Sequence, residues 1–324
     1  MAKYKVLQTD SIFPDVEIER SILADIDAEL VVAPAKDEAT LLGLVNDVDA
    51  ILTTYGEVTE KVIDACENCK IIARTGIGVN NIDVEAATAR GVMVSNVLNY
   101  CITEVADHCM ALMLVLLRQV HTYNRAVHNG VWDVNKSNIA RLNTLTLGLY
   151  GFGNIARAVA QRAKAFEMNV IASDPFVDPK LFEEFGVKSV GVDELIESSD
   201  VLSLHLPLLK STENIINKDV FKRMKKTAYL LNIARGGLVN EEDFIEAIDR
   251  GEIAGAGIDV MATEPGNVHS PLMTYPNVII TPHTAFYSEE SNVALREEST
   301  KQIVQALTEG EPTYWYNKKA MQGQ

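Results

Sequence analysis

The stretch TLGLYGFGNIARAVAQRAKAF constrains the fold more than any other part of the sequence. An apolar run leads into Gly151-x-Gly153-x-x-Ala156, which opens a helix-like segment. The first glycine of such a motif permits a tight turn, and the second lets backbone N–H groups approach a pyrophosphate. The small third residue lets helix and strand pack closely. The context predicts a dinucleotide-binding strand–turn–helix unit rather than the alternative, an ordinary turn between strand and helix.

Asp174 closes the next apolar run, NVIASDP, about 20 residues beyond the glycines. A carboxylate at this place accepts hydrogen bonds from the two ribose hydroxyls and repels a 2′-phosphate. No arginine follows in PFVDP to reverse that repulsion. The sequence therefore predicts NAD rather than NADP as cofactor, with a helix-capping Asp as the alternative.

Short apolar runs alternate with helix-like segments along the whole chain, which predicts parallel sheets with helices on both faces. The expected strands are Lys5–Leu7, Leu30–Val32, Ala50–Leu52, Ile71–Ala73, Val92–Val94, Leu145–Tyr150, Asn169–Ala172, Val201–Leu204, Tyr229–Ile233, Gly255–Val260 and Val278–Ile280. The expected helices are Ala39–Val45, Thr59–Ala65, Val84–Arg90, Ile102–His128, Asn154–Phe166, Val192–Glu197, Lys218–Arg223, Glu241–Arg250 and Glu289–Glu309.

Composition narrows the function classes. A length of 324 residues suggests about two domains. The net charge of -16 disfavours nucleic acid and anionic membrane surfaces as partners. The longest apolar run, Cys109–Leu117, is too short to span a bilayer, and the N-terminus shows no apolar signal core. We therefore expect a cytoplasmic protein.

Two of the four cysteines, Cys66 and Cys69, form a C-x-x-C pair in DACENCKII. A zinc site would need a second pair or histidines at ligand spacing, and neither is present in the sequence. Reduced thiols are the usual state in the cytoplasm. We predict no metal site, and we leave a redox or zinc role of the pair as the less favoured alternative.

Three chemically useful side chains follow three expected strands. Arg235 ends TAYLLNIAR, Glu264 lies shortly after Asp259 in GIDVMATEP, and His283 follows NVIITP. Ligands of open α/β sheets bind beyond the carboxyl ends of the strands, where these residues would meet. Each has an unremarkable alternative by itself: a solvated arginine, a turn-capping glutamate or a core histidine.

Together the three residues match the reduction of a ketone, which requires a hydride on carbon and a proton on oxygen. A reduced nicotinamide supplies the hydride, and a histidine titrates in the right range to supply the proton. A neighbouring carboxylate would favour the protonated imidazole and orient it. An arginine would polarise the carbonyl and bind an adjacent carboxylate.

These motifs, NIARGG, IDVxxxEP and TPH, together with LHLP and the phosphate loop, occur in an order that resembles the D-isomer-specific 2-hydroxyacid dehydrogenases. The resemblance covers almost the whole chain. NVLNYCITEVADH and TPHTAFYSEES are most similar to the branch that contains the C-terminal binding proteins and their bacterial dehydrogenase relatives. The resemblance implies an NAD-dependent enzyme that interconverts a small 2-keto acid and its D-2-hydroxy acid.

The resemblance also implies a role for each matching residue. Arg235 would bind and polarise the keto acid, Glu264 would partner the histidine, and His283 would be the acid–base. Asp259 would meet the nicotinamide carboxamide, and the N–H groups of Ile77 and Gly78 would hold the substrate carboxylate. The remaining implied cofactor contacts are Gly151, Phe152, Gly153, Asn154, Ile155, Asp174, His205, Pro207, Ile233 and Ala234.

The implied architecture is two doubly wound parallel-sheet lobes with a cleft between them. A Rossmann NAD-binding domain, residues 102–285, would be inserted in a flavodoxin-like substrate domain made of residues 1–101 and 286–324. The family's habit further implies a homodimer formed through the NAD-binding domain.

The substrate is the least constrained part of the prediction. The expected cleft loops carry no Lys or Arg beyond Arg74, and the chain ends before the regulatory domain of many phosphoglycerate enzymes, so phosphoglycerate is disfavoured. Tyr55 and Tyr100, with Phe286 and Tyr287, would wall a pocket or belong to the core. Pyruvate, hydroxypyruvate, phenylpyruvate and branched 2-keto acids are the candidates. The rival hypothesis is an NAD(H)-sensing interaction protein with little catalysis, which the lack of a long disordered tail disfavours.

Overall fold

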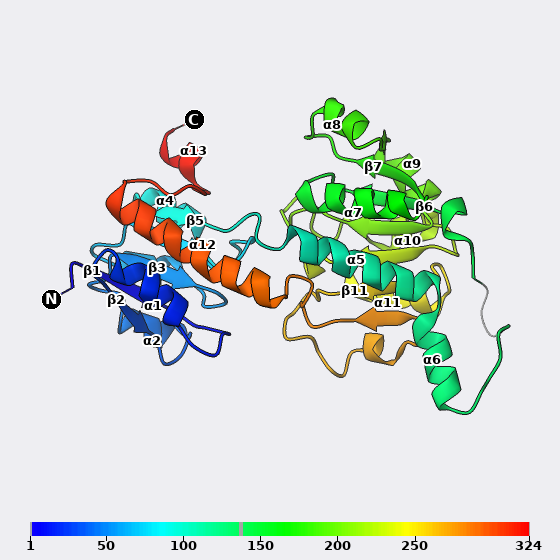
Figure 1. The fold of residues 1–324 in the computed structure, drawn as a ribbon, viewed down its shortest axis with the longest axis horizontal. Coiled ribbons are helices and arrows are strands. Elements are labelled where there is room, and N and C mark those ends of the chain that lie inside the picture. The colour runs from blue at the N-terminus through cyan, green and yellow to red at the C-terminus, as the bar shows by residue number, and fades with distance from the viewer. Residues whose placement is uncertain (1, 136–138, 324) are drawn as a thin grey trace. The chain divides into compact units, whose positions relative to one another are not determined.

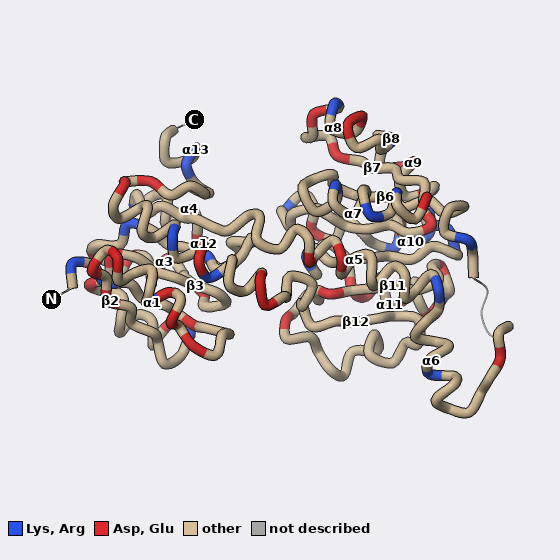
Figure 2. Tube along the Cα trace, viewed as in Figure 1, with Lys and Arg blue, Asp and Glu red and all other residues tan. Residues whose placement is uncertain are grey.

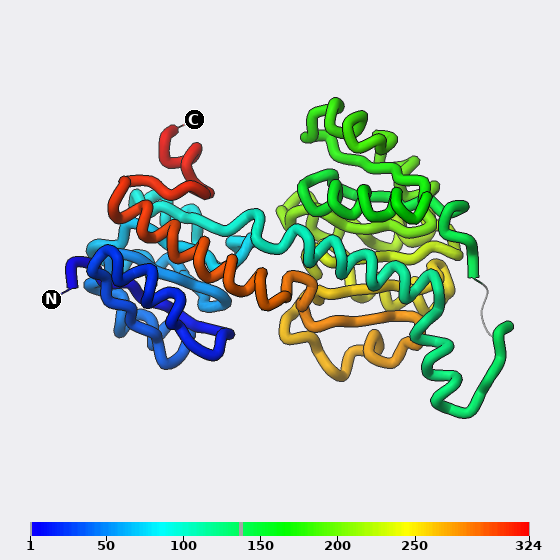
Figure 3. Tube along the Cα trace, in the orientation of Figure 1, coloured from blue at the N-terminus to red at the C-terminus, as the bar shows by residue number. Residues whose placement is uncertain are grey.

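The structure is a computed structural model that describes residues 2–135 and 139–323. The chain divides into two compact units. The first unit combines Met1–Tyr100 with Ser288–Gln324, and the second is Cys101–Tyr287. In Figure 3 the blue to cyan start of the chain and the deep orange to red helices at its end therefore belong to one unit. The first observed boundary, 100/101, lies one residue before the expected boundary 101/102. The second, 287/288, lies two residues after the expected boundary 285/286.

The first unit is a parallel sheet in the strand order β2-β1-β3-β4-β5. This order is that of flavodoxin-like sheets, as expected. Its elements are β1 (Tyr4–Gln8), α1 (Glu17–Ala24), β2 (Ala28–Val32), α2 (Glu38–Leu42), β3 (Ala50–Thr53), α3 (Glu60–Asp64), β4 (Ile71–Arg74), α4 (Val84–Ala89), β5 (Met93–Ser95), α12 (Glu289–Thr308) and α13 (Lys318–Met321).

Local sequence signals set where these helices begin. The side chains of Asp37, Thr59 and Asp83 accept backbone N–H groups in the first turns of α2, α3 and α4. Such caps satisfy donors that a helix start leaves without an intrahelical partner. At α12, Ser288 and Ser291 bond each other's backbone reciprocally, in a capping-box arrangement.

Two apolar layers, one on each face, hold the five-stranded sheet. One layer joins Leu7, Ile51 and Ile72 to residues of α3 and α4. The other joins Val6, Leu52 and Ile71 to the α12 residues Ile303, Ala306 and Leu307. Helix α12, although it comes late in the sequence, is therefore a structural part of the unit that the N-terminus begins, which explains why the unit is discontinuous.

The second unit is a seven-stranded parallel sheet in the order β12-β11-β10-β9-β6-β7-β8. Its elements are α5 (Ile102–Leu117), α6 (Val120–His128), η1 (Leu142–Thr144), β6 (Thr146–Tyr150), α7 (Asn154–Ala165), β7 (Asn169–Ser173), α8 (Pro179–Glu184), β8 (Lys188–Ser189), α9 (Val192–Ser198), β9 (Val201–Leu204), α10 (Lys218–Arg223), β10 (Tyr229–Asn232), η2 (Gly236–Leu238), α11 (Glu241–Asp249), β11 (Gly255–Ile258), η3 (Pro271–Thr274) and β12 (Val278–Ile280).

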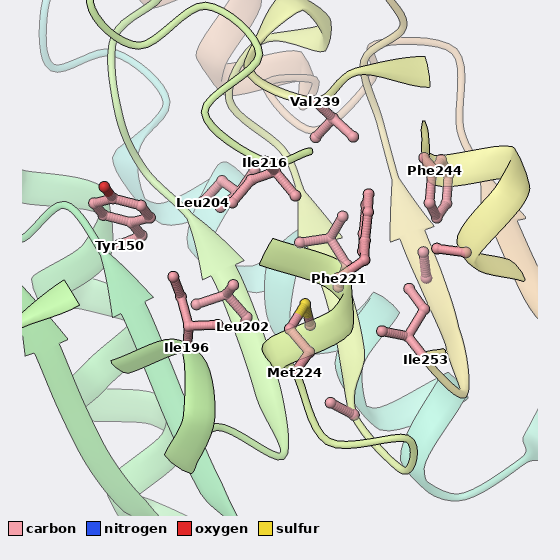
Figure 4. Packing of buried hydrophobic residues seen from close by; sticks show 14 of the residues in the cluster. Tyr150, Ile196, Leu202, Leu204, Ile216, Phe221, Met224, Val239, Phe244 and Ile253 are labelled. Carbon is pink, nitrogen blue, oxygen red and sulfur yellow. The ribbon is translucent and has the colours of Figure 1, made fainter. Parts of the chain in front are cut away.

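This strand order is the Rossmann order 3-2-1-4-5-6 with one further strand, which confirms the predicted fold class of the second unit. Figure 4 shows the core on one side of the sheet, where Phe221 of α10 and Phe244 of α11 are stacked with ring centroids 5.9 Å apart. These helices pack against Leu202, Leu204 and other strand residues. The core holds the strands in the register that brings their carboxyl ends into one row.

The expected helix 102–128 is two helices. The chain leaves helical geometry at Arg118 and Gln119, and Gln119 takes a left-handed backbone conformation with φ of 54°. Its side chain donates to the Leu116 carbonyl and to the Tyr229 hydroxyl, both at 2.9 Å. A contact with a residue 110 positions away thus stabilises a break that the helical pattern does not show.

Several short elements lay outside the expectation, namely α1, α8, β8 and α13. They are too short for a clear apolar period. Acidic positions occur on elements of both units, as Figure 2 shows. Among the described residues, no helix combines the length and the hydropathy needed to cross a bilayer.

Candidate active site

The sheet of the second unit places most of the predicted site residues along one edge. Gly151, Asp174, His205, Arg235, Asp259 and His283 each follow the carboxyl end of a strand: β6, β7, β9, β10, β11 and β12, respectively. Because all these strands are parallel, the loops after them emerge on the same edge. The strand order reverses between β6 and β9, which is where open α/β sheets bind ligands.

The glycines of the phosphate loop have different roles. Gly151 has a positive φ of 93°, and a Cβ atom there would lie 2.7 Å from the carbonyl oxygen of His205. Gly151 is therefore required by the turn and by the neighbouring strand. Gly153, just before α7, has ordinary backbone angles, and a Cβ atom there would meet open space. Its lack of a side chain leaves the helix N-terminus accessible to a phosphate.

Phe152 and Asp174 hold the loop in shape. The Phe152 ring is fully buried and stacks on Phe182 with centroids 4.6 Å apart, so its side chain belongs to the core. Its N–H donates to Asp174 Oδ2 at 2.9 Å, while the Phe176 N–H donates to Oδ1 at 2.9 Å. The Asp174 carboxylate is thus fixed at the end of β7, beside the glycine turn.

The other cofactor residues expected near the phosphate loop are Asn154, Ile155, His205 and Pro207. Asn154 and Ile155 form the first turn of α7, and the Asn154 side chain bonds the Arg157 guanidinium. His205 directly follows β9, and its N–H donates to the Tyr150 carbonyl at 2.8 Å. Its ring contacts the buried Ser203 hydroxyl at 2.9 Å, and burial lowers the pKa of His205 to about 4. Pro207 lies exposed two residues further on.

The loop after β10 is braced by Asn232. The Asn232 amide donates to the Arg235 carbonyl at 2.9 Å, and its oxygen accepts the Ala234 N–H at 3.2 Å. The Arg235 guanidinium donates to the Ala234 carbonyl at 2.6 Å and is half-buried. Ile233 is buried. These bonds fix the direction in which the arginine leaves the sheet.

Glu264 and His283 are in direct contact. Glu264 Oε2 lies 2.6 Å from His283 Nδ1, and Oε1 accepts the Met261 N–H at 3.1 Å. Burial raises the pKa of Glu264, but the bond and charge of His283, the Met261 N–H and the charge of Arg235 outweigh it and hold this pKa below its usual value. Glu264 is therefore a carboxylate at neutral pH, so His283 Nδ1 carries a proton and donates.

The carboxylate of Asp259 organises the loop that carries the histidine. Asp259 is 2% exposed and accepts the Thr281 hydroxyl at 2.5 Å and the N–H groups of Thr284 and Ala285 at 2.9 Å. Its carbonyl accepts the His283 N–H at 2.7 Å. His283 has a φ of 53°, a conformation that is strained for a residue with a side chain. The network around Asp259 holds it there.

Two residues of this network were missed by sequence reasoning. Thr281 donates its only hydroxyl proton to Asp259, so it must accept from His108 Nε2, which lies 3.0 Å away on α5. His108 is 173 positions from Thr281, and no local motif links the two. Thr281 itself could have been found, because it precedes Pro282 and His283 at the end of the same strand.

The first unit carries the expected substrate loop after β4. Ile77 and Gly78 are both half-buried, and the Ile77 carbonyl accepts the Asn96 amide at 2.6 Å. Asp10, which sequence reasoning also missed, accepts the N–H groups of Thr54, Tyr55 and Gly56 within 3.1 Å. It follows β1 and shapes the neighbouring loop after β3.

Two cations lie near the ring of Tyr55. The Lys36 ammonium is 5.7 Å from the centroid of its ring, and the Arg74 guanidinium is 5.8 Å from it. Lys36 comes from the loop after β2, which was not among the expected loops of this edge. Tyr100, another of the expected pocket aromatics, is half-buried at the end of the first unit. Within the described residues, no group of three or more His, Cys, Asp or Glu side chains could hold a metal ion.

The fold and the site define a dinucleotide-binding α/β protein with an arginine, a carboxylate and an imidazole at the edge of its sheet. Residues 110–285 match the NAD-binding domain of the D-isomer specific 2-hydroxyacid dehydrogenase family. The chain belongs to this family, and its second unit is the NAD-binding domain.

Named relatives cover the rest of the chain. The D-3-phosphoglycerate dehydrogenase of Methanocaldococcus jannaschii is 37% identical over 305 residues, which are 94% of this chain and 57% of the relative. The hydroxypyruvate reductase of Blautia hydrogenotrophica is 32% identical over 87% of this chain and 89% of its own length. The chain spans about half the length of the phosphoglycerate dehydrogenases it matches.

A solved structure is similar over nearly the full length. The D-lactate dehydrogenase of Aquifex aeolicus, complexed with NAD and lactic acid, has a TM-score of 0.84 and is 29% identical. The match covers 94% of this chain and 96% of that one. This similarity supports the two-sheet α/β fold and NAD as the cofactor.

Proposed function

We propose that the protein is an NAD-dependent dehydrogenase that interconverts a small 2-keto acid and the D-2-hydroxy acid. The observation that carries this proposal is the 2.6 Å contact between Glu264 and His283, next to the charge of Arg235 at the carboxyl edge of the NAD-binding domain. Such a set supplies a positioned proton and a cation that recognises a carboxylate.

His283 is the proposed acid–base. With Nδ1 donating to the Glu264 carboxylate, Nε2 is the ring atom that gives a proton to the keto oxygen during reduction and takes it back during oxidation. The Glu264 carboxylate stabilises the imidazolium and fixes its plane. Arg235 binds the substrate carboxylate and polarises the adjacent carbonyl.

The residues of the NAD-binding domain fit the cofactor. Gly153 opens the N-terminus of α7, where N–H groups and the helix dipole favour a pyrophosphate, and Asp174 stands ready to accept ribose hydroxyls. The bound nicotinamide supplies or accepts the hydride. Asp259 orients His283 through the loop that it holds, and Ile77 and Gly78 of the first unit hold the substrate carboxylate with their N–H groups.

The preference for NAD is tested at Asp174. Asp174→Ala removes the charge that repels a 2′-phosphate, so we expect the ratio of kcat/KM for NADH to that for NADPH to fall about tenfold, or ~1.4 kcal/mol. Asp219→Ala, on the exposed first turn of α10, is the control and should leave the ratio unchanged. An unaltered ratio in Asp174→Ala would place ribose recognition elsewhere.

The substrate proposal combines the relatives with the first unit. The match to a named hydroxypyruvate reductase covers 89% of that relative's length. Hydroxypyruvate is therefore the first substrate to test. Lys36 and Arg74 beside Tyr55 supply more positive charge than the loop sequences suggested. This weakens the charge argument against a phosphorylated substrate, and phosphohydroxypyruvate therefore joins pyruvate, phenylpyruvate and branched 2-keto acids.

The decisive experiment is a steady-state screen of this panel with NADH, followed by its absorbance, with chiral analysis of the product. We expect turnover with a D-product. His283→Asn should reduce kcat at least about 10³-fold while leaving the Kd for NADH within about threefold. His269→Asn, an exposed histidine of the same unit, is the matched control and should behave as the parent.

Two outcomes would contradict the proposal. Turnover by His283→Asn at the parental rate would remove the histidine from the mechanism. NADH binding without turnover of any keto acid would favour the NAD(H)-sensing interaction protein instead.

We also propose that the protein is a cytoplasmic homodimer that associates through the NAD-binding domain. The support comes from α6 and the segment after it, where Val120, Val127, Val131, Trp132 and Val134 are all exposed. Figure 1 shows this part leading away from the seven-stranded sheet. A run of exposed apolar side chains of this kind is typical of a protein interface.

A further inference from the structure

Two loops of the first unit meet in one hydrogen-bond network. The Tyr55 loop, residues 54–58, follows β3, and the Gly78 loop, residues 75–82, follows β4. Because β3 and β4 are neighbouring parallel strands, both loops emerge at the carboxyl edge of the five-stranded sheet. The substrate carboxylate is proposed to bind the Gly78 loop, so the residues that hold the two loops together bear on the same site.

Asp10 holds the Tyr55 loop by its backbone. Asp10 follows β1, and its Oδ1 atom accepts the N–H groups of Thr54 and Gly56 at 3.1 and 3.0 Å. Its Oδ2 atom accepts the N–H group of Tyr55 at 2.8 Å. Hydrogen bonds to a charged acceptor are stronger than those to a neutral one. Three consecutive N–H groups on one carboxylate therefore fix the path of the loop.

The Tyr55 loop also lies directly against the end of β1. A Cβ atom at Gly56 would lie only 2.5 Å from the hydroxyl oxygen of Thr9, which is fully buried. The same Thr9 hydroxyl lies 2.7 Å from Asp10 Oδ1. On the other side, the Gly56 carbonyl accepts the Thr53 hydroxyl at 2.8 Å. The loop therefore has little room to move while Asp10 is in place.

Asn81 joins the Tyr55 loop to the Gly78 loop. Its Nδ2 atom donates to the Gly56 carbonyl at 2.8 Å, and its Oδ1 atom accepts Arg74 Nε at 3.2 Å. The Asn81 carbonyl accepts the Val58 N–H at 2.8 Å. Arg74 ends β4 just before the Gly78 loop, and Asn81 lies near the end of that loop. A displacement of the Tyr55 loop would therefore be transmitted to the Gly78 loop.

We propose that Asp10 and Asn81 are positioning residues that hold the Tyr55 loop and the Gly78 loop as one rigid surface for the substrate. Asp10 fixes the first loop, and Asn81 extends this order to the second, whose N–H groups at Ile77 and Gly78 then meet the substrate carboxylate in a fixed place. Loops that are ordered before binding lose less entropy when the substrate binds. This inference rests on the proposed function, because that function assigns the carboxylate to the Gly78 loop.

The coupling of the two loops is tested by amide hydrogen exchange of the full chain, read by mass spectrometry without substrate or cofactor. Asp10→Ala removes the acceptor of three N–H groups, so we expect exchange at least about tenfold faster in the Tyr55 loop and also in the Gly78 loop. Asn81→Ala should accelerate exchange in both loops as well.

Asp37→Ala is the matched control. Asp37 likewise accepts a backbone N–H group and a hydroxyl, at 3.0 and 2.7 Å, but both belong to Thr40 in the first turn of α2. Its loss should accelerate exchange only around α2. Any general effect of removing a loop aspartate from this unit would appear in this variant too.

The positioning role is tested by steady-state kinetics with the keto acid that the parent reduces fastest. Looser loops weaken the binding of substrate and transition state alike, so Asp10→Ala should raise KM at least about tenfold, while kcat and the Kd for NADH change less than about threefold. Asp10→Asn keeps one acceptor oxygen and should restore part of the affinity. Combined with Asn81→Ala, Asp10→Ala should raise KM by less than the product of the two single effects, because both act through the same surface. Asp37→Ala should keep the parental KM.

Three results would overturn the proposal. In the first, exchange in the Gly78 loop is unchanged in Asp10→Ala. In the second, exchange rises in both loops but KM stays at the parental value. In the third, kcat and the affinity for NADH fall together with KM, as general damage to the chain would cause. A parent that reduces no keto acid would refute the proposed function instead, and the exchange experiment would still decide whether the two loops are coupled.

Discussion

Several residues of the site act mainly by holding the loop of His283 in place through hydrogen bonds. The left-handed backbone of His283 would relax if the Asp259 network were lost, because an L-residue at this φ carries a cost of order 1 kcal/mol. The Thr281 hydroxyl links Asp259 to His108 and bonds neither the imidazole of His283 nor Glu264. It is a positioning residue.

Thr281→Val removes this link with little change of shape. Asp259 and His108 each lose a hydrogen bond, and the loop of His283 loosens, so we expect kcat to fall about 10- to 100-fold while KM for the keto acid and the Kd for NADH change less than about threefold. Thr281→Ser should restore most of the activity. Thr274→Val, whose exposed hydroxyl bonds only a neighbouring carbonyl, is the control. Equal loss in kcat and NADH affinity would argue for a general structural role.

His205 gives the second unit a pH dependence. Burial lowers its pKa from 6.5 to about 4, so the unfolded chain binds the proton first as the pH falls. The free energy of unfolding is therefore unaffected by His205 above about pH 6.5 and decreases as the pH falls toward 4. His205→Gln lacks this titration and should retain about 2 kcal/mol more of its neutral-pH stability at about pH 4.5 than the parent does. Urea unfolding at neutral pH and at about pH 4.5 measures this difference in stability. Equal losses of stability in the parent and in His205→Gln would show that the ring is solvated.

At the scale of elements, α1 and α12 are joined by a buried ion pair. Arg296 of α12 donates to both carboxylate oxygens of Glu19 at 2.8 and 2.6 Å, and to Asp15 at 3.0 Å. Glu19 is 1% exposed and Arg296 6%. Phe13 covers the guanidinium at 5.0 Å from its ring centroid. Helix α12 is thereby oriented on the first sheet.

Removing one partner of this ion pair should strongly destabilise the first unit. Arg296→Met leaves the Glu19 charge buried without its cation, so we expect the first unit to lose about 3–5 kcal/mol, and Glu19→Leu combined with Arg296→Met to recover much of it. Lys301→Met on the same helix removes exposed ion pairs to Glu297 and Glu298 and should cost no more than ~1 kcal/mol. Thermal unfolding compares the four proteins. Similar losses from the two single methionine substitutions would contradict the role of burial.

For the whole molecule, the proposed dimer predicts a sedimentation mass of twice 35.6 kDa. Trp132→Glu combined with Val127→Glu places charges in the exposed apolar segment, so we expect monomers at micromolar concentrations. Val268→Glu changes another exposed valine of the same unit and should leave the mass unchanged. A parental chain that sediments as a monomer would refute the dimer directly.

Much of the fold could be predicted because its signals are local. An apolar run, a glycine turn and an amphipathic segment are each written in consecutive residues, and the strand ends at Asp174, Arg235, Asp259 and His283 follow from them. The helix break at Gln119 could not be predicted, because Tyr229, to which the Gln119 side chain donates, lies on another element. The short helices α1 and α8 carry too few turns to show a period.

The sequence by itself determined the class of fold, the cofactor loop and the three residues proposed for chemistry, because parallel strands carry their C-terminal residues to one edge. Only the tertiary structure decided which distant groups surround them. His108 reaches Thr281 from α5, and Lys36 approaches Tyr55 from the loop after a different strand. Such contacts depend on strand order and helix docking, and these arise from packing of the whole unit rather than from any short stretch of chain.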